Sequence, residues 1–209
     1  PLLLGSGLLG AGILVALIGF LDDHGHVNAR WRLLVHGVSA IAVVWVSNGL
    51  PPLQLFGKVI DFGLIGWVLA TIAVIWLLNL YNFMDGINGM SGMYSLVVLG
   101  SLWYVNQFII QFVDHDFIIY PVIACFVFLF FNFRKKAKCF LGDIGSMGIA
   151  FWIIALSALL IIKTEQFKWF LFLAVYGIET ILTIIERLKL KENIFDAHRR
   201  HLYQLFANE

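Results

Sequence analysis

The chain has 209 residues, of which 61% are hydrophobic and only 13% are charged, and its mean hydropathy is +0.90. These values exclude an ordinary soluble domain and predict an integral membrane protein. The formal net charge of +1 gives no general affinity for nucleic acid. The two cysteines, Cys125 and Cys139, have neither the spacing of a zinc motif nor the density of a disulfide framework.

Seven apolar windows are long enough to cross a membrane, since a bilayer core about 30 Å thick needs roughly 20 apolar residues. They cover residues 1–21, 32–48, 63–80, 92–112, 117–133, 146–162 and 168–187. The sequence therefore predicts an all-α, polytopic membrane helix bundle with about seven transmembrane helices in one domain over residues 1–209. Because the chain starts inside an apolar stretch without an initiator Met, we expect further spans to precede it.

The connections between these windows alternate between the two sides of the membrane. Residues 22–31, 81–91, 134–145 and the tail from 187 fall on one side, and residues 49–62, 113–116 and 163–167 on the other. The first side carries eleven Lys and Arg residues, whereas the second has only Lys58, Lys163 and Lys168. Cytoplasmic loops carry the excess of basic residues, so the first side is predicted to be cytoplasmic. It also receives four polar segments, here called islands: residues 21–24, 79–86, 141–146 and 196–201.

The first island ends the first window with the pair Asp22-Asp23. Two carboxylates about 4 Å apart repel by about 4 kcal/mol at an effective dielectric constant near 20, which predicts a cation or a shared proton nearby. Neighbouring helical residues point about 100° apart, so the two acids are expected to have unequal roles. The alternative is a solvated helix end whose acids only stop membrane insertion.

The second island places Asn79, Asn82 and Asp85 at the end of the third window, followed by Gly86 and Gly89. Residues three apart share one helix face, and glycines let the backbone approach a ligand closely. The amides suit a sugar or a nucleotide. The alternative is a helix C-terminus at which Asn and Gly serve only the backbone.

The third island, Gly142-Asp143-Ile144-Gly145-Ser146, follows a basic run over residues 134–138 and opens the sixth window. Free N–H groups at a helix N-terminus bind phosphate, but a carboxylate at that position needs a cation. Mg²⁺ bridging Asp143 and a pyrophosphate meets this need, with Mn²⁺ as a substitute. The basic run also fits simple anchoring at the membrane surface.

The fourth island contains Asp196, His198, Arg199, Arg200 and His201. Arg side chains suit bidentate phosphate recognition, and without a metal-binding pattern the histidines are better read as phosphate contacts. The alternative is an interfacial tail attracted by anionic lipid.

Glu179 is the only acidic residue deep inside a predicted span. Burying a carboxylate there is costly, so the sequence predicts a partner such as Thr183 or Arg187.

The islands, in their order and on one side, resemble the polyprenyl-phosphate N-acetylhexosamine-1-phosphate transferases of the glycosyltransferase family 4 type. The resemblance runs from Asp22 to Gln204. It implies transfer of a sugar 1-phosphate from a UDP-N-acetylhexosamine to polyprenyl (undecaprenyl) phosphate, with release of UMP and dependence on Mg²⁺. It also implies a bacterial plasma membrane location with the site facing the cytoplasm, and it leaves a homodimer open.

The resemblance implies catalytic roles for Asp22, Asp23 and Asp143, with Mg²⁺ held at Asp143 and Asp22. One of the two adjacent aspartates would orient or deprotonate the acceptor, while a covalent aspartyl route stays open. The substrate-binding residues are expected to be Asn79, Asn82, Asp85, His198, Arg199, Arg200 and His201.

Two positions depart from the family pattern. Asn88 stands where the family often has a second Asp, and the terminal motif reads Asp-Ala-His-Arg-Arg-His instead of consecutive histidines. The terminal form resembles the branch that starts O-antigen synthesis more than the branch that uses the peptidoglycan pentapeptide.

Two rival functions are consistent with a membrane protein rich in carboxylates. An ion-coupled transporter usually places its acids near the bilayer midplane, whereas here they lie at the ends of spans. A polyprenyl-diphosphate phosphatase would use similar phosphate contacts but needs no sugar donor.

Overall fold

The computed structural model describes residues 2–25, 27–46, 49, 52–55, 58–192 and 201–207, and within these ranges each apolar window of the sequence is mostly helical. The first helices are α1 (Leu2–Gly25), α2 (Ala29–Val46), α3 (Gly63–Phe83) and α4 (Met90–Phe108). They are followed by α5 (Asp116–Asn132), α6 (Gly142–Thr164), the 3₁₀ helix η1 (Phe167–Leu173), α7 (Ala174–Lys189) and α8 (Leu202–Ala207). The predicted all-α membrane bundle is confirmed, with one small addition: the antiparallel strands β1 (Leu53–Leu55) and β2 (Lys58–Ile60).

Five stretches of helix in the described part of the chain are long and apolar enough to span a membrane. They lie on α1, α2, α3, α6 and the η1–α7 pair. The two remaining predicted spans are helical but less suited to crossing alone. α5 has 17 residues, and α4 is less apolar because it carries Ser91, Ser95 and Asn106 on its buried side.

Helix α6 forms the centre of the bundle and packs against α1, α3, α4 and η1. Its buried face includes Ala150, Phe151, Ile153 and Ile154. Because α6 is surrounded on several sides, its apolar residues are buried in protein instead of facing lipid. Its first turn, which carries Asp143, therefore has a fixed place among the ends of the neighbouring helices.

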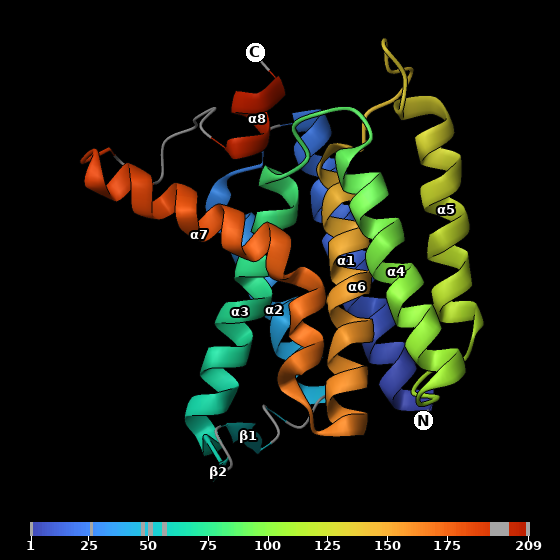
Figure 1. Ribbon diagram of the computed structural model, residues 1–209, viewed down its shortest axis with the longest axis vertical. Helices are drawn as coiled ribbons and strands as arrows, with labels where there is room; N and C mark the ends of the chain where they lie inside the picture. The colour runs from blue at the N-terminus through green and yellow to red at the C-terminus, as the bar shows by residue number, and fades with distance from the viewer. Residues whose placement is uncertain are drawn as a thin grey trace.

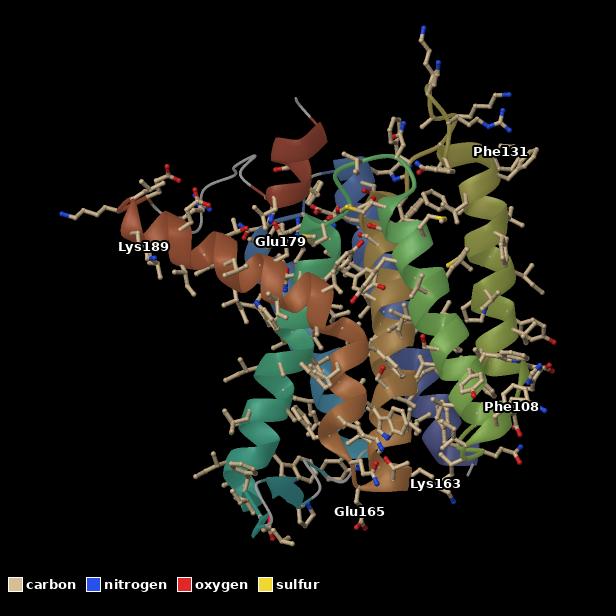
Figure 2. The ribbon with its side chains drawn as sticks, viewed as in Figure 1. Phe108, Phe131, Lys163, Glu165, Glu179 and Lys189 are labelled. Atoms are coloured by element: carbon tan, nitrogen blue, oxygen red, sulfur yellow. The ribbon has the colours of Figure 1, made fainter. Side chains whose placement is uncertain are left out.

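The polar islands that the structure describes lie at one end of the bundle, and the β-hairpin lies at the other (Figure 1). The end of α1, the α3–α4 connection, the start of α6 and helix α8 are all found at the first end (Figure 1). Figure 2 shows Lys163 and Glu165 at this opposite end of the bundle. Beyond η1 the chain bends, and α7 leaves the bundle sideways (Figure 1). The bend places Glu179 beneath α8.

Candidate active site

Asp23 caps the N-terminus of helix α6. Its Oδ1 accepts a hydrogen bond from the Asp143 N–H at 2.9 Å, and its Oδ2 accepts one from the Ile144 N–H at 3.1 Å. Helix α1 and the start of α6 lie very close together here. Gly19 has no side chain, and a Cβ there would lie 2.7 Å from the Ile144 nitrogen, while Gly142 has a φ of +64°. The N–H groups that the sequence indicated for phosphate thus bind a protein carboxylate, as helix dipoles favour.

Asp22 faces a different partner, the guanidinium of Arg32 at the start of α2. The Arg32 Nη1 is hydrogen-bonded to Asp22 Oδ2 and lies 3.5 Å from Asp143 Oδ2. The other Asp22 oxygen accepts the Val27 N–H at 2.7 Å, which holds the α1–α2 turn against the site. The side chains of Asp22, Asp143 and Arg32 are 13%, 23% and 26% exposed, so this cluster is only partly hydrated. One cation therefore neutralises two carboxylates from helices far apart in the sequence.

Asn82, at the end of α3, completes the cluster. Its Nδ2 donates to Asp143 Oδ1 at 2.6 Å and to the Ser146 hydroxyl at 3.1 Å. Asn79 lies one turn earlier, but its amide donates to the Ile75 carbonyl at 2.8 Å within α3. The structure therefore brings Asn82 to Asp143 and leaves Asn79 bonded to its own helix.

Asp85 lies in the α3–α4 connection, outside the membrane-spanning helices. Burial raises the pKa of its carboxyl above the ordinary value of 3.8. The next residue, Gly86, lies directly against Tyr203 of α8: a Cβ there would be 2.1 Å from the Tyr203 hydroxyl. That hydroxyl donates to the Phe83 carbonyl at 3.2 Å. Helix α8 thus packs onto the connection that carries Asp85.

Asn88, the departure from the family pattern, joins two connections of the site. Its Nδ2 donates to the Arg134 carbonyl at 3.1 Å, and the neighbouring Gly89 N–H donates to Asn132 Oδ1 at 2.6 Å. The α3–α4 connection is therefore tied to the start of the α5–α6 connection by main-chain and amide contacts. Asn88 itself is exposed.

Glu179 pairs with the last histidine of the fourth island. The His201 Nδ1 lies 2.8 Å from Glu179 Oε2, and the Leu202 N–H donates to Glu179 Oε1 at 2.9 Å. Of the partners expected for Glu179, Thr183 donates to Oε1 at 3.2 Å, whereas Arg187 pairs with Glu192 at 3.3 Å. Figure 2 shows Glu179 where α7 passes α8. His201, which was expected to contact phosphate, instead pairs with this carboxylate, whose side chain is only 11% exposed and so needs a partner. Glu179 therefore lies at the polar end of the bundle and not deep in a span.

The other residues of the fourth island, Asp196, His198, Arg199 and Arg200, lie outside the described residues. Their predicted contacts with phosphate stay predictions.

The donor chemistry of the cluster fits Mg²⁺. Asp22 and Asp143 offer carboxylate oxygens, and the Asn82 amide and Ser146 hydroxyl lie beside Asp143. Within the described ranges there is no group of three or more His, Cys, Asp or Glu side chains that would enclose a metal. Mg²⁺ is commonly held by one or two carboxylates with substrate phosphates completing its shell, so two protein carboxylates suffice. Arg32 meanwhile supplies the positive charge between them.

Sequence reasoning missed two members of this cluster, Arg32 and Ser146. A cation was expected near Asp22-Asp23, and Arg32 was counted among the basic residues of the cytoplasmic side, but Arg32 was not assigned as that cation. Its position ten residues after Asp22, across a short turn between antiparallel helices, was the available signal. Ser146 lies one turn after Asp143 on α6, and this spacing places both on the face that Asn82 approaches.

The comparison with known proteins points in one direction. The model of glycosyl transferase family 4 matches residues 6–161. The phospho-N-acetylmuramoyl-pentapeptide-transferase of Streptococcus pyogenes serotype M12 (strain MGAS2096) is 27% identical over 198 residues, which cover 87% of this chain and 56% of the relative. The probable undecaprenyl-phosphate N-acetylglucosaminyl 1-phosphate transferase of Bacillus subtilis (strain 168) is 26% identical over 204 residues, with 93% and 56% covered. The chain spans about half the length of these relatives.

Proposed function

Because the chain belongs to glycosyl transferase family 4, we propose that it transfers an N-acetylhexosamine 1-phosphate from a UDP-sugar to membrane polyprenyl phosphate and releases UMP. Two relatives with transferase names, one of them for undecaprenyl phosphate, support this proposal. The observation that carries it is the Asp22–Arg32–Asp143 cluster, which is built from the ends of three apolar helices and hydrogen-bonded to Asn82. A site of this kind is accessible both to a lipid phosphate at the membrane surface and to a nucleotide from the cytoplasm.

The chemistry requires positive charge, because a lipid phosphate must approach a diphosphate that is itself negative. In the proposed reaction an oxygen of the lipid phosphate attacks the phosphorus that bears the sugar. The bond from that phosphorus to the oxygen of UMP breaks, and UMP leaves with the electron pair. Bound at Asp143 with Asp22 as second carboxylate, Mg²⁺ would neutralise the diphosphate and the charge on the leaving UMP.

The chain's own residues position the reactants in this proposal. Asp22, whose partner Arg32 lies in the cluster, orients the lipid phosphate or accepts its proton. Asp23 keeps α6 in place through its cap, and this cap fixes where Asp143 stands. Asn82 holds the Asp143 carboxylate from the other side. Preorganised groups of this kind act without reorganising during the reaction.

The alternative mechanism has two steps and passes through a covalent intermediate on Asp22. It makes a distinct prediction, because UMP would then leave before the lipid phosphate binds. Exchange of labelled UMP into the UDP-sugar without any acceptor lipid would support the covalent route. A strict requirement for the acceptor in this exchange would support direct attack.

We propose that the chain belongs to the branch that initiates O-antigen or another surface polysaccharide, because its terminal motif, Asp-Ala-His-Arg-Arg-His, has the form of that branch. The relative from Streptococcus pyogenes favours a second candidate, in which the donor carries a pentapeptide. Membranes containing the full-length protein should be incubated with polyprenyl phosphate and a panel of donors. The panel comprises the UDP forms of N-acetylglucosamine, N-acetylfucosamine, N-acetylquinovosamine and N-acetylmuramoyl-pentapeptide, with the lipid product identified by mass. A product from an amino sugar alone supports the first branch, a pentapeptide product supports the second, and no lipid-linked product from any donor contradicts the transferase proposal.

A further inference from the structure

The two carboxylates expected to bind metal already share a cation. Both ion pairs that the described part of the chain makes with Asp22 and Asp143 come from the single Nη1 atom of Arg32. The guanidinium therefore lies where a divalent ion bridging the same two side chains would also have to be. Two cations in one partly buried site repel each other strongly, since the effective dielectric constant there is well below that of water.

Arg32 cannot make room for a metal ion by losing its proton, because the arginine side chain stays charged at any physiological pH. The metal ion can bind there only if the Arg32 guanidinium moves away. The side chain is long, and 26% of its surface is exposed, so it has room to turn towards the solvent side of the cluster. The backbone around it need not move, since the Val27 N–H keeps the α1–α2 turn on Asp22 Oδ1.

A guanidinium that leaves a carboxylate needs a new anion, and the substrate brings one. Arginine binds phosphate oxygens with its planar fork at least as well as it binds carboxylates. A diphosphate seated near Asp143 would therefore offer Arg32 an equivalent partner as the metal takes the carboxylates.

We propose that Arg32 is an exchangeable counter-cation: it neutralises Asp22 and Asp143 in the metal-free enzyme, and moves to the diphosphate when metal and UDP-sugar bind together. This inference rests on the proposed function. It makes the free enzyme a weak metal site and makes metal and donor bind cooperatively. By linkage, the factor by which the donor strengthens metal binding equals the factor by which metal strengthens donor binding.

The test measures metal binding without turnover. Mn²⁺ binding to the full-length protein in detergent is followed by the electron paramagnetic resonance signal of free Mn²⁺, with Asp143→Asn defining the background bound elsewhere. We expect Arg32→Gln to bind Mn²⁺ roughly tenfold more tightly than wild type when no nucleotide is present, since it removes a competing cation. The matched control is Arg30→Gln, an exposed side chain two residues away with the same change of charge. Its Mn²⁺ affinity should stay within about twofold of wild type.

A second variant covers the case in which Arg32→Gln does not fold. Arg32→Lys keeps the charge but loses the fork, so its Mn²⁺ affinity without nucleotide should lie close to wild type. The increase in Mn²⁺ affinity on adding UDP-sugar should fall by roughly threefold in Arg32→Lys, because a point charge holds phosphate less specifically. Unchanged or weaker Mn²⁺ binding in folded Arg32→Gln, or an undiminished donor effect in Arg32→Lys, would overturn the proposal.

The result is independent of the donor panel. Tighter Mn²⁺ binding by Arg32→Gln with no lipid product from any donor would support the competition between Arg32 and metal and contradict the transferase proposal. Lipid product combined with unchanged Mn²⁺ binding would support the transferase proposal and contradict the exchange of Arg32.

Discussion

Asp22 and Asp23 are neighbours in the chain, but each contacts a different part of the site. Asp23 accepts two main-chain N–H groups of α6, whereas Asp22 pairs with Arg32. Successive residues of an α-helix point about 100° apart, so one helix end can serve two separate structures. A single metal ion is therefore not expected to use both acids as equal ligands.

The first prediction concerns Asp143. Asp143→Asn keeps the size of the side chain but removes its charge, so the proposed metal and diphosphate would lose their main protein anchor. We expect UMP release by the full-length enzyme to fall by roughly a hundredfold or more, the scale of losing a preorganised electrostatic contact. The control is Asp116→Asn at the start of α5, an exposed acid outside the cluster. Near-normal UMP release by Asp143→Asn would show that the metal assignment is wrong.

The second prediction concerns pH. Burial raises the pKa of the Asp85 carboxyl above 3.8, so the folded state binds its proton more tightly than the unfolded state. Its contribution to stability is therefore complete below the unfolded pKa and is lost as the pH rises through the folded pKa. We expect Asp85→Asn to unfold at a higher temperature than wild type near neutral pH. The difference should vanish as the pH falls towards the ordinary value of 3.8.

Tryptophan fluorescence of the detergent-solubilised protein measures both unfolding temperatures across the pH range. Asp114→Asn, at an exposed acid, is the control and should follow wild type. A lower unfolding temperature for Asp85→Asn at neutral pH would contradict the assigned direction.

The sequence identified the carboxylates of the site and predicted a cation beside Asp22-Asp23, but it did not show which residue supplies that cation. Acidic residues at the ends of apolar spans are rare enough to be noticed, whereas a basic residue on the cytoplasmic side is expected in any membrane protein. Arg32 therefore looked ordinary until the structure placed it between Asp22 and Asp143. The Asn79 amide could not be assigned either, because its choice between its own helix and the site depends on local geometry.

At the scale of elements, the α1–α6 junction positions the cluster. Gly19 of α1 faces the main chain of Asp143 and Ile144 so closely that a Cβ there would lie 2.7 Å from the Ile144 nitrogen. At Gly142 a Cβ would lie 2.6 Å from Asp23 Oδ2, and φ is positive, which favours glycine. Backbone packs directly on backbone, and the aspartate cap closes the contact.

The third prediction tests this junction. Gly19→Ala should destabilise the protein by about 1–3 kcal/mol, because the added methyl meets main-chain atoms that cannot turn aside. Gly10→Ala, in the same helix with nothing within 4 Å of the added Cβ, is the matched control. It should be neutral or slightly stabilising, since alanine favours helix more than glycine does. Equal unfolding temperatures of the two variants would contradict the close approach.

The helices themselves followed from hydropathy, but the division of the last window did not. Window 168–187 is one apolar stretch, yet the structure divides it into η1 and α7. Hydropathy sums depend on composition and do not register where a helix bends. The signal lay in pattern: α7 buries Tyr176, Thr180 and Thr183 and exposes Ile178 and other apolar residues. A polar buried face suits a helix that covers a polar site.

At the scale of the whole molecule, the family resemblance is confirmed by the match over residues 6–161. The described islands also meet at one end of the bundle (Figure 1). The alternation of connections was enough to predict this meeting, because each span reverses the direction of the chain. That the shared end faces the cytoplasm rests on the excess of basic residues and stays a prediction.

The fourth prediction tests this orientation. Lys136→Cys, in the α5–α6 connection, and Lys163→Cys, at the opposite end, are both exposed positions. In a background with Cys139→Ser, a membrane-impermeant maleimide should label Lys136→Cys only in inverted vesicles. It should label Lys163→Cys only in intact cells, since the predicted topology places the two residues on opposite sides of the bilayer. Labelling of both variants in the same preparation would contradict the topology.

The contact between Gly19 and the start of α6 also affects how this sequence can diverge. A spacing set by main chain against main chain does not depend on which apolar side chains surround it. The apolar side chains around this junction can then change without altering the spacing of α1 and α6, provided that Gly19, Gly142 and Asp23 stay in place. Relatives that share only 26–27% of their residues with this chain are what such freedom would produce.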